Sequence, residues 1–286
     1  MNRLIVGCGY LGGRIAARWR ECGDRITVVT RNAEKAARLT EDGHAAIVAD
    51  VTQPAMLHSL PRADTVLYAI GFDRSAGASI DEVYAAGLRH VLDALPSDPD
   101  RVIYISTTGV YGSAAGNWVD EETPPAPARD GGRASLAAEE VLRTHPLGQS
   151  GVILRSAGIY GPNRVPFLDQ LRAGEPIPAP ESGYLNLIHV DDAAETVLHA
   201  AAAVIIEAPR VFCVSDGKPV IRGDYYREVA LRVGAPPPTF VPPAADSPRA
   251  LRAGSDRRVK NDRMLLELGV KLRYPSYREG LAAILG

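Results

Sequence analysis

A short apolar strand near the start of the chain runs directly into a glycine-rich turn: Leu4-Ile5-Val6-Gly7-Cys8-Gly9-Tyr10-Leu11-Gly12. The turn has the pattern G-x-G-x-x-G, which gains meaning here because it follows a buried strand and opens a helical pattern. In such a turn Gly7 permits the tight bend, Gly9 lets a ligand approach the backbone, and Gly12 allows close helix–strand packing. The N-terminus of the following helix favours phosphate groups. The stretch therefore predicts a dinucleotide-binding turn, and the alternative is a glycine turn without a ligand.

Strand and helix patterns alternate behind this turn. The candidate strands are nearly continuous apolar runs, as expected for parallel strands that are buried on both faces. They cover residues 4–6, 26–30, 46–49, 65–69, 102–106 and 152–155. Helical patterns cover residues 11–21, 33–41 and 79–95. This alternation predicts an α/β fold of the Rossmann type, with a doubly wound parallel sheet.

The regular alternation of strand and helix patterns ends after about Gly158, where prolines become frequent. A helix at 190–203 and a strand at 211–214 still fit the sheet domain. We therefore expect a dinucleotide-binding domain of residues 1–158 plus about 190–215. Residues 159–189 plus about 216–286 would form a smaller, discontinuous substrate-binding region.

Composition excludes several classes of protein. The 286 residues are 46% hydrophobic and 23% charged, as in a globular protein with a sizeable core. A net charge of -2 gives no basic surface for nucleic acid or an anionic membrane. The apolar run at 197–206 is about half of the ~20 residues that a membrane span needs. Three scattered cysteines and six unclustered histidines predict no disulfide framework, no metal site and a cytoplasmic location.

The end of the second strand bears on the choice of dinucleotide. NAD-binding proteins usually place Asp or Glu there, about twenty residues past the glycines, to bind the ribose hydroxyls. This chain has Thr30-Arg31-Asn32, and its next acid is Glu34. The guanidinium of Arg31 suits a 2′-phosphate, with Thr30 and Asn32 as neighbouring donors. The sequence thus favours NADP over NAD, unless Arg31 is a solvated surface arginine.

Several segments together resemble the extended and atypical branches of the short-chain dehydrogenase/reductase superfamily, in particular epimerase/dehydratase-like proteins. The matching segments are Ala49-Asp50-Val51, Ala69-Ile70-Gly71, Ser106-Thr107-Thr108-Gly109-Val110-Tyr111-Gly112, Leu154-Arg155 with Ile159-Tyr160-Gly161-Pro162, and Asn186-Leu187-Ile188-His189-Val190-Asp191-Asp192-Ala193. The resemblance implies that Asp50 and Val51 lie at the adenine. It also places residues 69–71 near the ribose and pyrophosphate, with Tyr10 and Leu11 in the phosphate turn.

The catalytic part of the family pattern is different here. Family members use Ser or Thr together with a Tyr-x-x-x-Lys pair, in which the lysine lowers the pKa of the tyrosine. Aligning the helix that contains Leu136-Ala137-Ala138-Glu139-Glu140 puts Gly131 at the tyrosine position and Ser135 at the lysine position. The family's helix asparagine falls on Tyr84. Only the hydroxyl position is kept, as Thr107.

The family pattern therefore does not identify the proton donor of this chain. Thr107 is expected to hydrogen-bond the reacting carbonyl or hydroxyl oxygen, with Thr108 as a second candidate. A titratable group must lie within hydrogen-bond reach of that oxygen. The resemblance places four such groups around the cleft: Tyr111, Tyr160, Tyr184 and His189. A packing role is the stronger interpretation for Tyr111 and His189. Tyr160 is retained as a catalytic candidate, with a structural role as its alternative.

Two functions follow from these patterns. The first is an NADP-dependent oxidoreductase or epimerase/dehydratase-like enzyme that acts on a small polar, sugar-like metabolite at the carboxyl edge of the sheet. The second is a catalytically silent NADP-binding sensor or regulatory protein, which the missing Tyr and Lys favour. The oligomeric state stays open, with the helices at 79–95 and 136–142 as a route to a homodimer.

Overall fold

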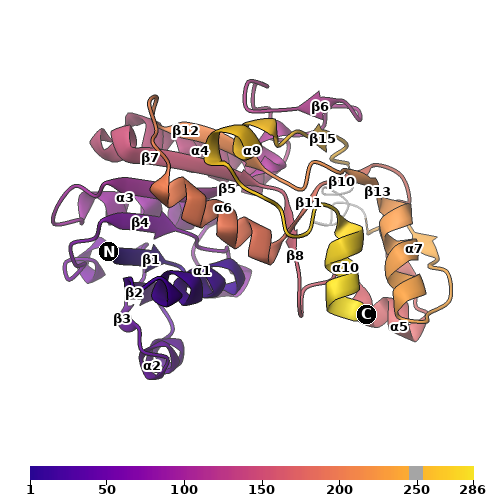
Figure 1. Ribbon diagram of the computed structural model, residues 1–286, viewed down its shortest axis with the longest axis horizontal. Coiled ribbons are helices and arrows are strands. Elements are labelled where there is room, and N and C mark those ends of the chain that lie inside the picture. Colours follow the sequence, from indigo (N-terminus) through magenta and orange to yellow (C-terminus); the bar gives the residue numbers. More distant parts are fainter. Residues whose placement is uncertain (245–253) are drawn as a thin grey trace. The chain divides into compact units, whose positions relative to one another are not determined.

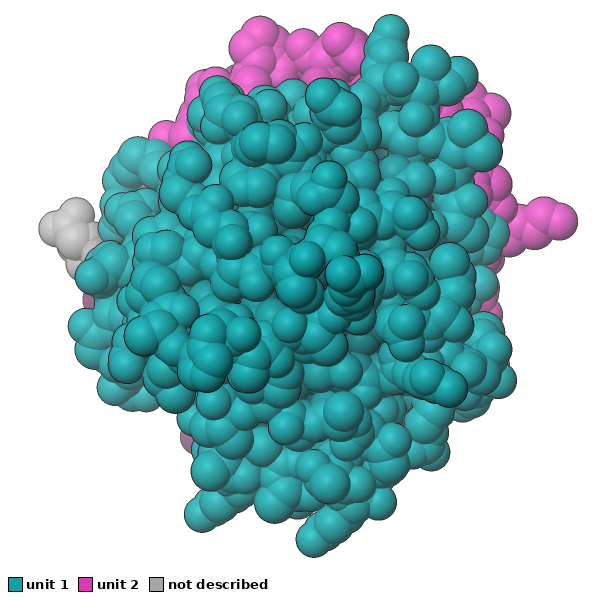
Figure 2. Space-filling model, turned by 90° about the vertical axis from the view of Figure 1, so that its left-hand side faces the viewer, with its two compact units in different colours: residues 1–107, 130–155, 194–212 teal, residues 108–129, 156–193, 213–286 magenta. Residues whose placement is uncertain are grey.

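The computed structural model describes residues 1–244 and 254–286, and residues 245–253, part of the predicted second region, lie outside the described residues. The chain divides into two compact units. The first consists of Met1–Thr107, Asp130–Arg155 and Ala194–Phe212. The second consists of Thr108–Arg129, Ser156–Ala193 and Cys213–Gly286. Figure 2 shows that the separate stretches of the first unit form one continuous body.

A seven-stranded sheet forms the centre of the first unit, in the order β12-β7-β5-β4-β1-β2-β3 (Figure 1). Its strands are β1 (Asn2–Val6), β2 (Arg25–Thr30), β3 (Ala45–Val48), β4 (Thr65–Tyr68), β5 (Arg101–Thr107), β7 (Gly151–Ser156) and β12 (Arg210–Val214). Strand β1 pairs in parallel with both β2 and β4, so that Val6 lies opposite Val29 and Tyr68. The strand order reverses between β1 and β4, which is where sheets of this kind bind ligands. The predicted doubly wound α/β fold is confirmed.

Helices cover both faces of the sheet. The side chains of β1 alternate between these two faces, so each face contributes to a separate helix contact. Leu4 and Val6 belong to a core cluster that also contains residues of the helices α3 and α4. Ile5 points the other way, and its side chain lies beneath Gly12 of α1. The helices of this unit are α1 (Tyr10–Glu21), α2 (Ala33–Glu41), α3 (Gly87–Asp93) and α4 (Asp130–Thr144). Helix α6 (Val190–Ala202) begins in the second unit and continues into the first.

The helical stretch predicted at 79–95 is not uniform. A π-helical turn, Glu82–Ala86, precedes α3. At the junction, a Cβ on Gly87 would lie 2.6 Å from the Tyr68 hydroxyl and 2.7 Å from a Val51 methyl. The backbone of α3 therefore sits directly on the sheet side chains, which a larger residue at this position would prevent.

The second unit has short strands and helices around its own core. Its strand pairs are β6 (Trp118–Val119) with β15 (Arg258–Val259), β8 (Gly158–Tyr160) with β11 (Leu187–His189), β9 (Ile177–Pro178) with β14 (Phe240–Val241), and β10 (Tyr184–Leu185) with β13 (Val220–Ile221). Its helices are α5 (Leu168–Ala173), α7 (Arg222–Arg232), α9 (Asp262–Leu268) and α10 (Tyr277–Leu285). Aromatic side chains, among them Tyr160, Tyr225 and Tyr226, fill the core.

Candidate functional site

The three glycines of the turn after β1 differ in what surrounds them. Gly7 has a φ of +95°, and a Cβ there would lie 2.8 Å from the backbone of Ile70. A Cβ on Gly12 would collide with the Gly7 carbonyl oxygen. A Cβ on Gly9 would meet no atom within 4 Å. Gly7 and Gly12 are thus required by the fold, whereas Gly9 leaves space that a ligand can enter.

The beginning of α1 suits an anionic group. The helix follows Gly9 with no side-chain cap, and its first turn contains no acidic residue. Helix N-termini carry a partial positive charge and unpaired N–H groups. Because most helices place Ser, Thr, Asp or Asn at this position, an uncapped glycine start fits a pyrophosphate that would take the place of the cap.

The end of β2 places Arg31 where the sequence predicts it, with a partner that the sequence did not indicate. Its guanidinium pairs with the Asp73 carboxylate, and both side chains are almost half exposed, at 42% and 49%. The side chain of Asn32 accepts a hydrogen bond from the Lys35 N–H at 2.7 Å and so caps α2. The Thr30 hydroxyl accepts from the Asn32 N–H at 3.3 Å.

The remaining predicted cofactor residues lie at the carboxyl ends of β3 and β4. Asp50 accepts hydrogen bonds from the N–H and hydroxyl of Thr52, at 2.9 and 2.8 Å. The Val51 carbonyl lies 2.8 Å from His90 Nδ1. The N–H of Ala69 continues the sheet by bonding the Val6 carbonyl at 2.8 Å. A Cβ on Gly71 would meet nothing within 4 Å, so this position, like Gly9, is open.

Three consecutive hydroxyls at the end of β5 have different surroundings. Ser106 donates a hydrogen bond of 2.6 Å to Glu139 and is buried. Thr107 is the last residue of β5 and is half-buried. Thr108 is buried and opens the short 3-10 helix Thr108–Tyr111. Of these three residues, Thr107 is the only one that is not buried.

Helix α4, which the resemblance aligns with the family's catalytic helix, carries a buried ion pair. Gly131 lies in its first turn, where a Cβ would meet only Ile80, at 3.8 Å. Ser135 is buried. One turn further on, the fully buried Glu139 accepts hydrogen bonds from Arg155 at 2.6 and 3.0 Å. No lysine of the sequence has a tyrosine four residues before it: the pairs are Arg31 and Lys35, Val214 and Lys218, Asp256 and Lys260, and Glu267 and Lys271.

Tyr160 is enclosed within the second unit. Its hydroxyl donates to the Ser276 carbonyl at 3.4 Å, and its ring lies edge-on to His189, with 5.4 Å between centroids. A Cβ on Gly280 would collide with that hydroxyl. Burial raises the pKa of Tyr160, so the side chain is a neutral phenol at physiological pH.

Two other candidates also have partners within this unit. Tyr111 has its hydroxyl 3.0 Å from Cys213 Sγ, and the Tyr184 N–H donates to Asp256 at 3.0 Å.

A buried carboxyl group in the second unit was missed by the sequence analysis. Asp216 accepts a hydrogen bond from the Lys218 N–H at 2.9 Å, while its Oδ2 is buried without a partner among the described residues. Burial raises the pKa of Asp216 to about 7. The sequence signal is weak, because a single Asp after an apolar strand is also typical of an exposed turn.

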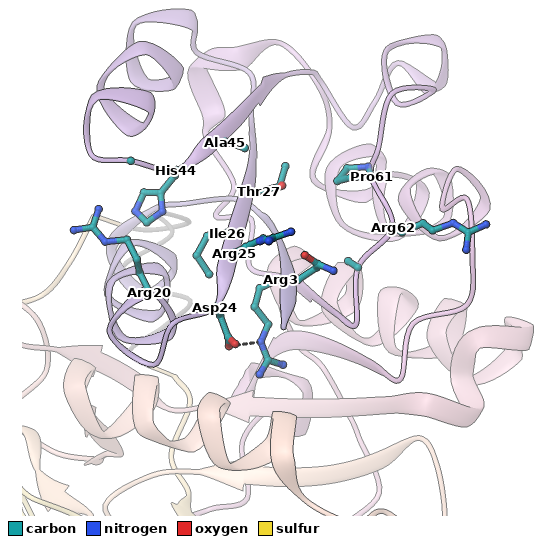
Figure 3. A pocket seen from close by; sticks show the side chains of 13 residues that line it. Arg3, Arg20, Asp24, Arg25, Ile26, Thr27, His44, Ala45, Pro61 and Arg62 are labelled. Atoms are coloured by element: carbon teal, nitrogen blue, oxygen red, sulfur yellow. Dashed lines mark hydrogen bonds and ion pairs between the residues drawn. The ribbon is translucent and has the colours of Figure 1, made fainter.

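A cavity of about 380 Å³ lies at the amino edge of the sheet (Figure 3). Arg3 there pairs with Asp24, at 2.7 Å. Arg20 bonds the Asp42 carbonyl at the end of α2. These cations lie where α1 and α2 end, and positive charge at a helix C-terminus is stabilising. Because the cavity is at the edge opposite the glycine turn, its basic lining does not belong to the predicted cofactor site.

The described residues 1–244 and 254–286 contain no helix with the length and apolarity of a membrane span. Within the same residues, no group of three or more His, Cys, Asp or Glu side chains is arranged to hold a metal ion.

Comparisons with known proteins agree with the fold of the chain. The profile of the NAD dependent epimerase/dehydratase family matches residues 4–214. Protein YeeZ of Escherichia coli (strain K12) is 30% identical over 280 residues, which cover 95% of each chain. The 3-diazoavenalumate denitrifying reductase of a Streptomyces species is 28% identical over 98% of this chain and 99% of its own. The dTDP-glucose 4,6-dehydratase DesIV of Streptomyces venezuelae, solved with NAD bound, shares the fold. Its TM-score is 0.83 at 21% identity, covering all of this chain and 96% of its own. The chain belongs to the NAD dependent epimerase/dehydratase family.

Proposed function

We propose that the protein is an NADP-dependent oxidoreductase that acts on a small polar metabolite. The observation that carries the proposal is the open space at Gly9, directly before a helix without a side-chain cap. The close backbone contacts of Gly7 and Gly12 fix the turn around it. A protein that had lost its ligand would be free to fill such a position with a side chain. A glycine turn that serves only the fold does not need a glycine there.

The choice of NADP rests on Arg31. DesIV was solved with NAD, and dinucleotide-binding folds of this type select NAD with an acidic residue or NADP with a nearby arginine. In this chain no acid follows β2 before Glu34, and the guanidinium of Arg31 stands at the end of that strand. A guanidinium can form paired, charge-assisted hydrogen bonds with a phosphate. We infer that Arg31 binds the 2′-phosphate.

The reaction is assigned to the end of β5. A bound nicotinamide would supply or accept a hydride, and the chain itself must orient the substrate oxygen. Thr107, the half-buried last residue of β5, is the first candidate for this role, and the buried Thr108 is the second. Tyr160 remains a candidate only as a neutral donor, because its pKa is raised rather than lowered. The reductase relative from Streptomyces, similar over nearly its whole length, supports hydride transfer as the type of reaction.

The test is cofactor binding together with turnover. Calorimetric titration should show NADPH binding about ten- to a hundredfold tighter than NADH, the difference expected for one charge-assisted contact. The replacement Arg31→Asp should abolish that difference. Equal dissociation constants for the two dinucleotides, unchanged by the replacement, would refute the assignment of Arg31. Tight NADPH binding without oxidation of the cofactor on any metabolite of a broad carbonyl panel would favour the sensor instead.

Once a substrate is found, Thr107→Val tests the reacting hydroxyl. Loss of one oriented donor should lower kcat by about a hundredfold and leave the Kd for NADPH unchanged. The matched control is Thr144→Val, because that hydroxyl is exposed and bonds only carbonyl oxygens of its own helix. A rate unchanged by Thr107→Val would remove this residue from the reaction and direct attention to Thr108.

A further inference from the structure

We propose that Asp73 is a specificity-determining residue of the cofactor site, because its carboxylate competes with the 2′-phosphate of NADP for Arg31. The inference rests on the proposed function, in which Arg31 binds that phosphate. Asp73 is 42 residues away in the sequence and reaches Arg31 from the segment that follows β4. It lies outside every motif that the sequence analysis associates with the cofactor.

The structure holds Asp73 in place from several directions. Its Oδ1 accepts hydrogen bonds from the N–H and hydroxyl of Ser75, at 3.0 and 2.6 Å, and so caps a short 3-10 helix. The preceding residue, Phe72, donates its N–H to the Tyr84 hydroxyl at 3.3 Å and packs edge-on against the Tyr84 ring. The hydrogen bonds from Ser75, and then the nearby Arg31, lower the pKa of Asp73. The carboxylate is therefore a fixed and fully ionised group at neutral pH.

Arg31 is held by fewer contacts than Asp73, which also accepts two hydrogen bonds from Ser75. Its contact with Asp73 uses one terminal nitrogen and the oxygen that Ser75 leaves unoccupied, Oδ2. A guanidinium has five N–H donors on a long side chain, so it can turn toward a second anion. The neighbouring Asn32 is committed to capping α2, which fixes the backbone behind Arg31. Any 2′-phosphate that binds must draw Arg31 away from Asp73 or share it.

The sign of the effect follows from charge. A 2′-phosphate carries up to two negative charges, so a fixed carboxylate beside Arg31 both repels it and occupies its partner. NAD carries no charge at this position, and its binding leaves the Arg31–Asp73 pair undisturbed. Asp73 consequently lowers the preference for NADP without affecting NAD. The chain would therefore hold the preference for NADP below the level that Arg31 alone would give.

The experiment measures the Kd values of NADPH and NADH for the full chain and for Asp73→Asn. Asn keeps the cap, because its side-chain oxygen can accept from Ser75, while the negative charge is removed. We expect Asp73→Asn to tighten NADPH about three- to tenfold and to leave NADH within about twofold. The gain should shrink in 1 M salt, where charges are screened over about 3 Å. Asp73→Ser, which also retains a capping side chain, should behave in the same way.

The matched control is Glu82→Gln, which removes one exposed capping acid from the same segment. Glu82 bonds the Ser79 N–H and has no contact with Arg31, so its replacement should leave both Kd values unchanged. Weaker NADPH binding in both Asp73 variants would overturn the inference, because it would mean that Asp73 positions Arg31 for the phosphate. Unchanged NADPH binding in both variants would overturn it as well. The proposed function fails separately, if Arg31→Leu leaves the NADPH to NADH ratio unchanged. A ratio that responds to Arg31→Leu but not to Asp73→Asn keeps the function and refutes the competition.

Discussion

The glycine turn before α1 and the helix α4 lie in the same unit, and their surroundings differ. The turn keeps open space at Gly9 beside a helix end without a cap. Helix α4 has Gly131 and Ser135 where the resemblance expects Tyr and Lys, and it carries the buried pair of Glu139 with Arg155. The turn leaves space and an uncapped helix end, whereas α4 pairs its buried carboxylate with an arginine of the same unit.

The difference shows which part of a family pattern can change without loss of the fold. Glu139 and Arg155 join α4 to β7, and Ser106 adds a hydrogen bond from β5. This network stabilises the helix without a catalytic pair. The glycine turn has no such substitute, because the close approach of Gly7 to Ile70 and of Gly12 to Gly7 fixes its backbone. Four changes test this comparison.

The largest effect is expected from Glu139→Ala. It leaves Arg155, which is only 2% exposed, as a buried charge without its carboxylate. Breaking one side of such a pair costs about 3–5 kcal/mol in the free energy of unfolding. Urea denaturation followed by circular dichroism measures the loss, and Glu140→Ala, an exposed neighbour on the same helix, is the control. A loss below about 1 kcal/mol would mean that water or a shifted backbone compensates Arg155.

A second, pH-dependent effect concerns Asp216, a buried acid that, among the described residues, has no arginine partner comparable to that of Glu139. Asp216 has a pKa of about 7 in the folded chain, compared with about 3.9 when unfolded. Between these values the folded chain binds a proton that the unfolded chain does not, so Asp216 lowers stability as the pH rises through this window.

The replacement Asp216→Asn removes that dependence. Its stabilising effect should be larger at pH 8 than at pH 5, by about 2–3 kcal/mol. Denaturation curves of both proteins at the two pH values measure it. The same difference between the proteins at both pH values would show that Asp216 is ionised throughout.

The third effect is on binding rather than stability. Because nothing lies within 4 Å of a Cβ on Gly9, Gly9→Val should fold with a stability within about 1 kcal/mol of the original. Its side chain fills the space in front of α1, so NADPH affinity should fall by about a hundredfold or more, or about 2.7 kcal/mol. Calorimetry on a variant with an unchanged melting temperature separates the two quantities. Undiminished NADPH binding would contradict the assignment of the turn.

The contrast between these regions also shows what the sequence could predict. Strands β1 to β5 and the glycine turn follow from local patterns, since buried parallel strands are apolar runs and a tight turn requires glycine. Pairings between distant residues do not follow from such patterns. The contacts of Arg31 with Asp73 and of Glu139 with Arg155 join segments that only the folded chain brings together. The close approach of Gly87 to Tyr68 and Val51 is likewise a property of packing that local patterns do not predict.

The smallest effect is expected at the position where the family has its tyrosine. A Cβ on Gly131 would meet only Ile80, at an ordinary contact distance of 3.8 Å. Alanine is favoured over glycine in a helix by up to about 1 kcal/mol, and less near the first turn, so Gly131→Ala should stabilise the chain by about 0.3–1 kcal/mol. Thermal unfolding should show a rise of about 1–4 °C, with an unchanged Kd for NADPH. If Gly131 lines a working substrate site, the added methyl group should instead raise KM or lower kcat. That result would return α4 to the reaction centre and remove the contrast between a functional turn and a structural helix.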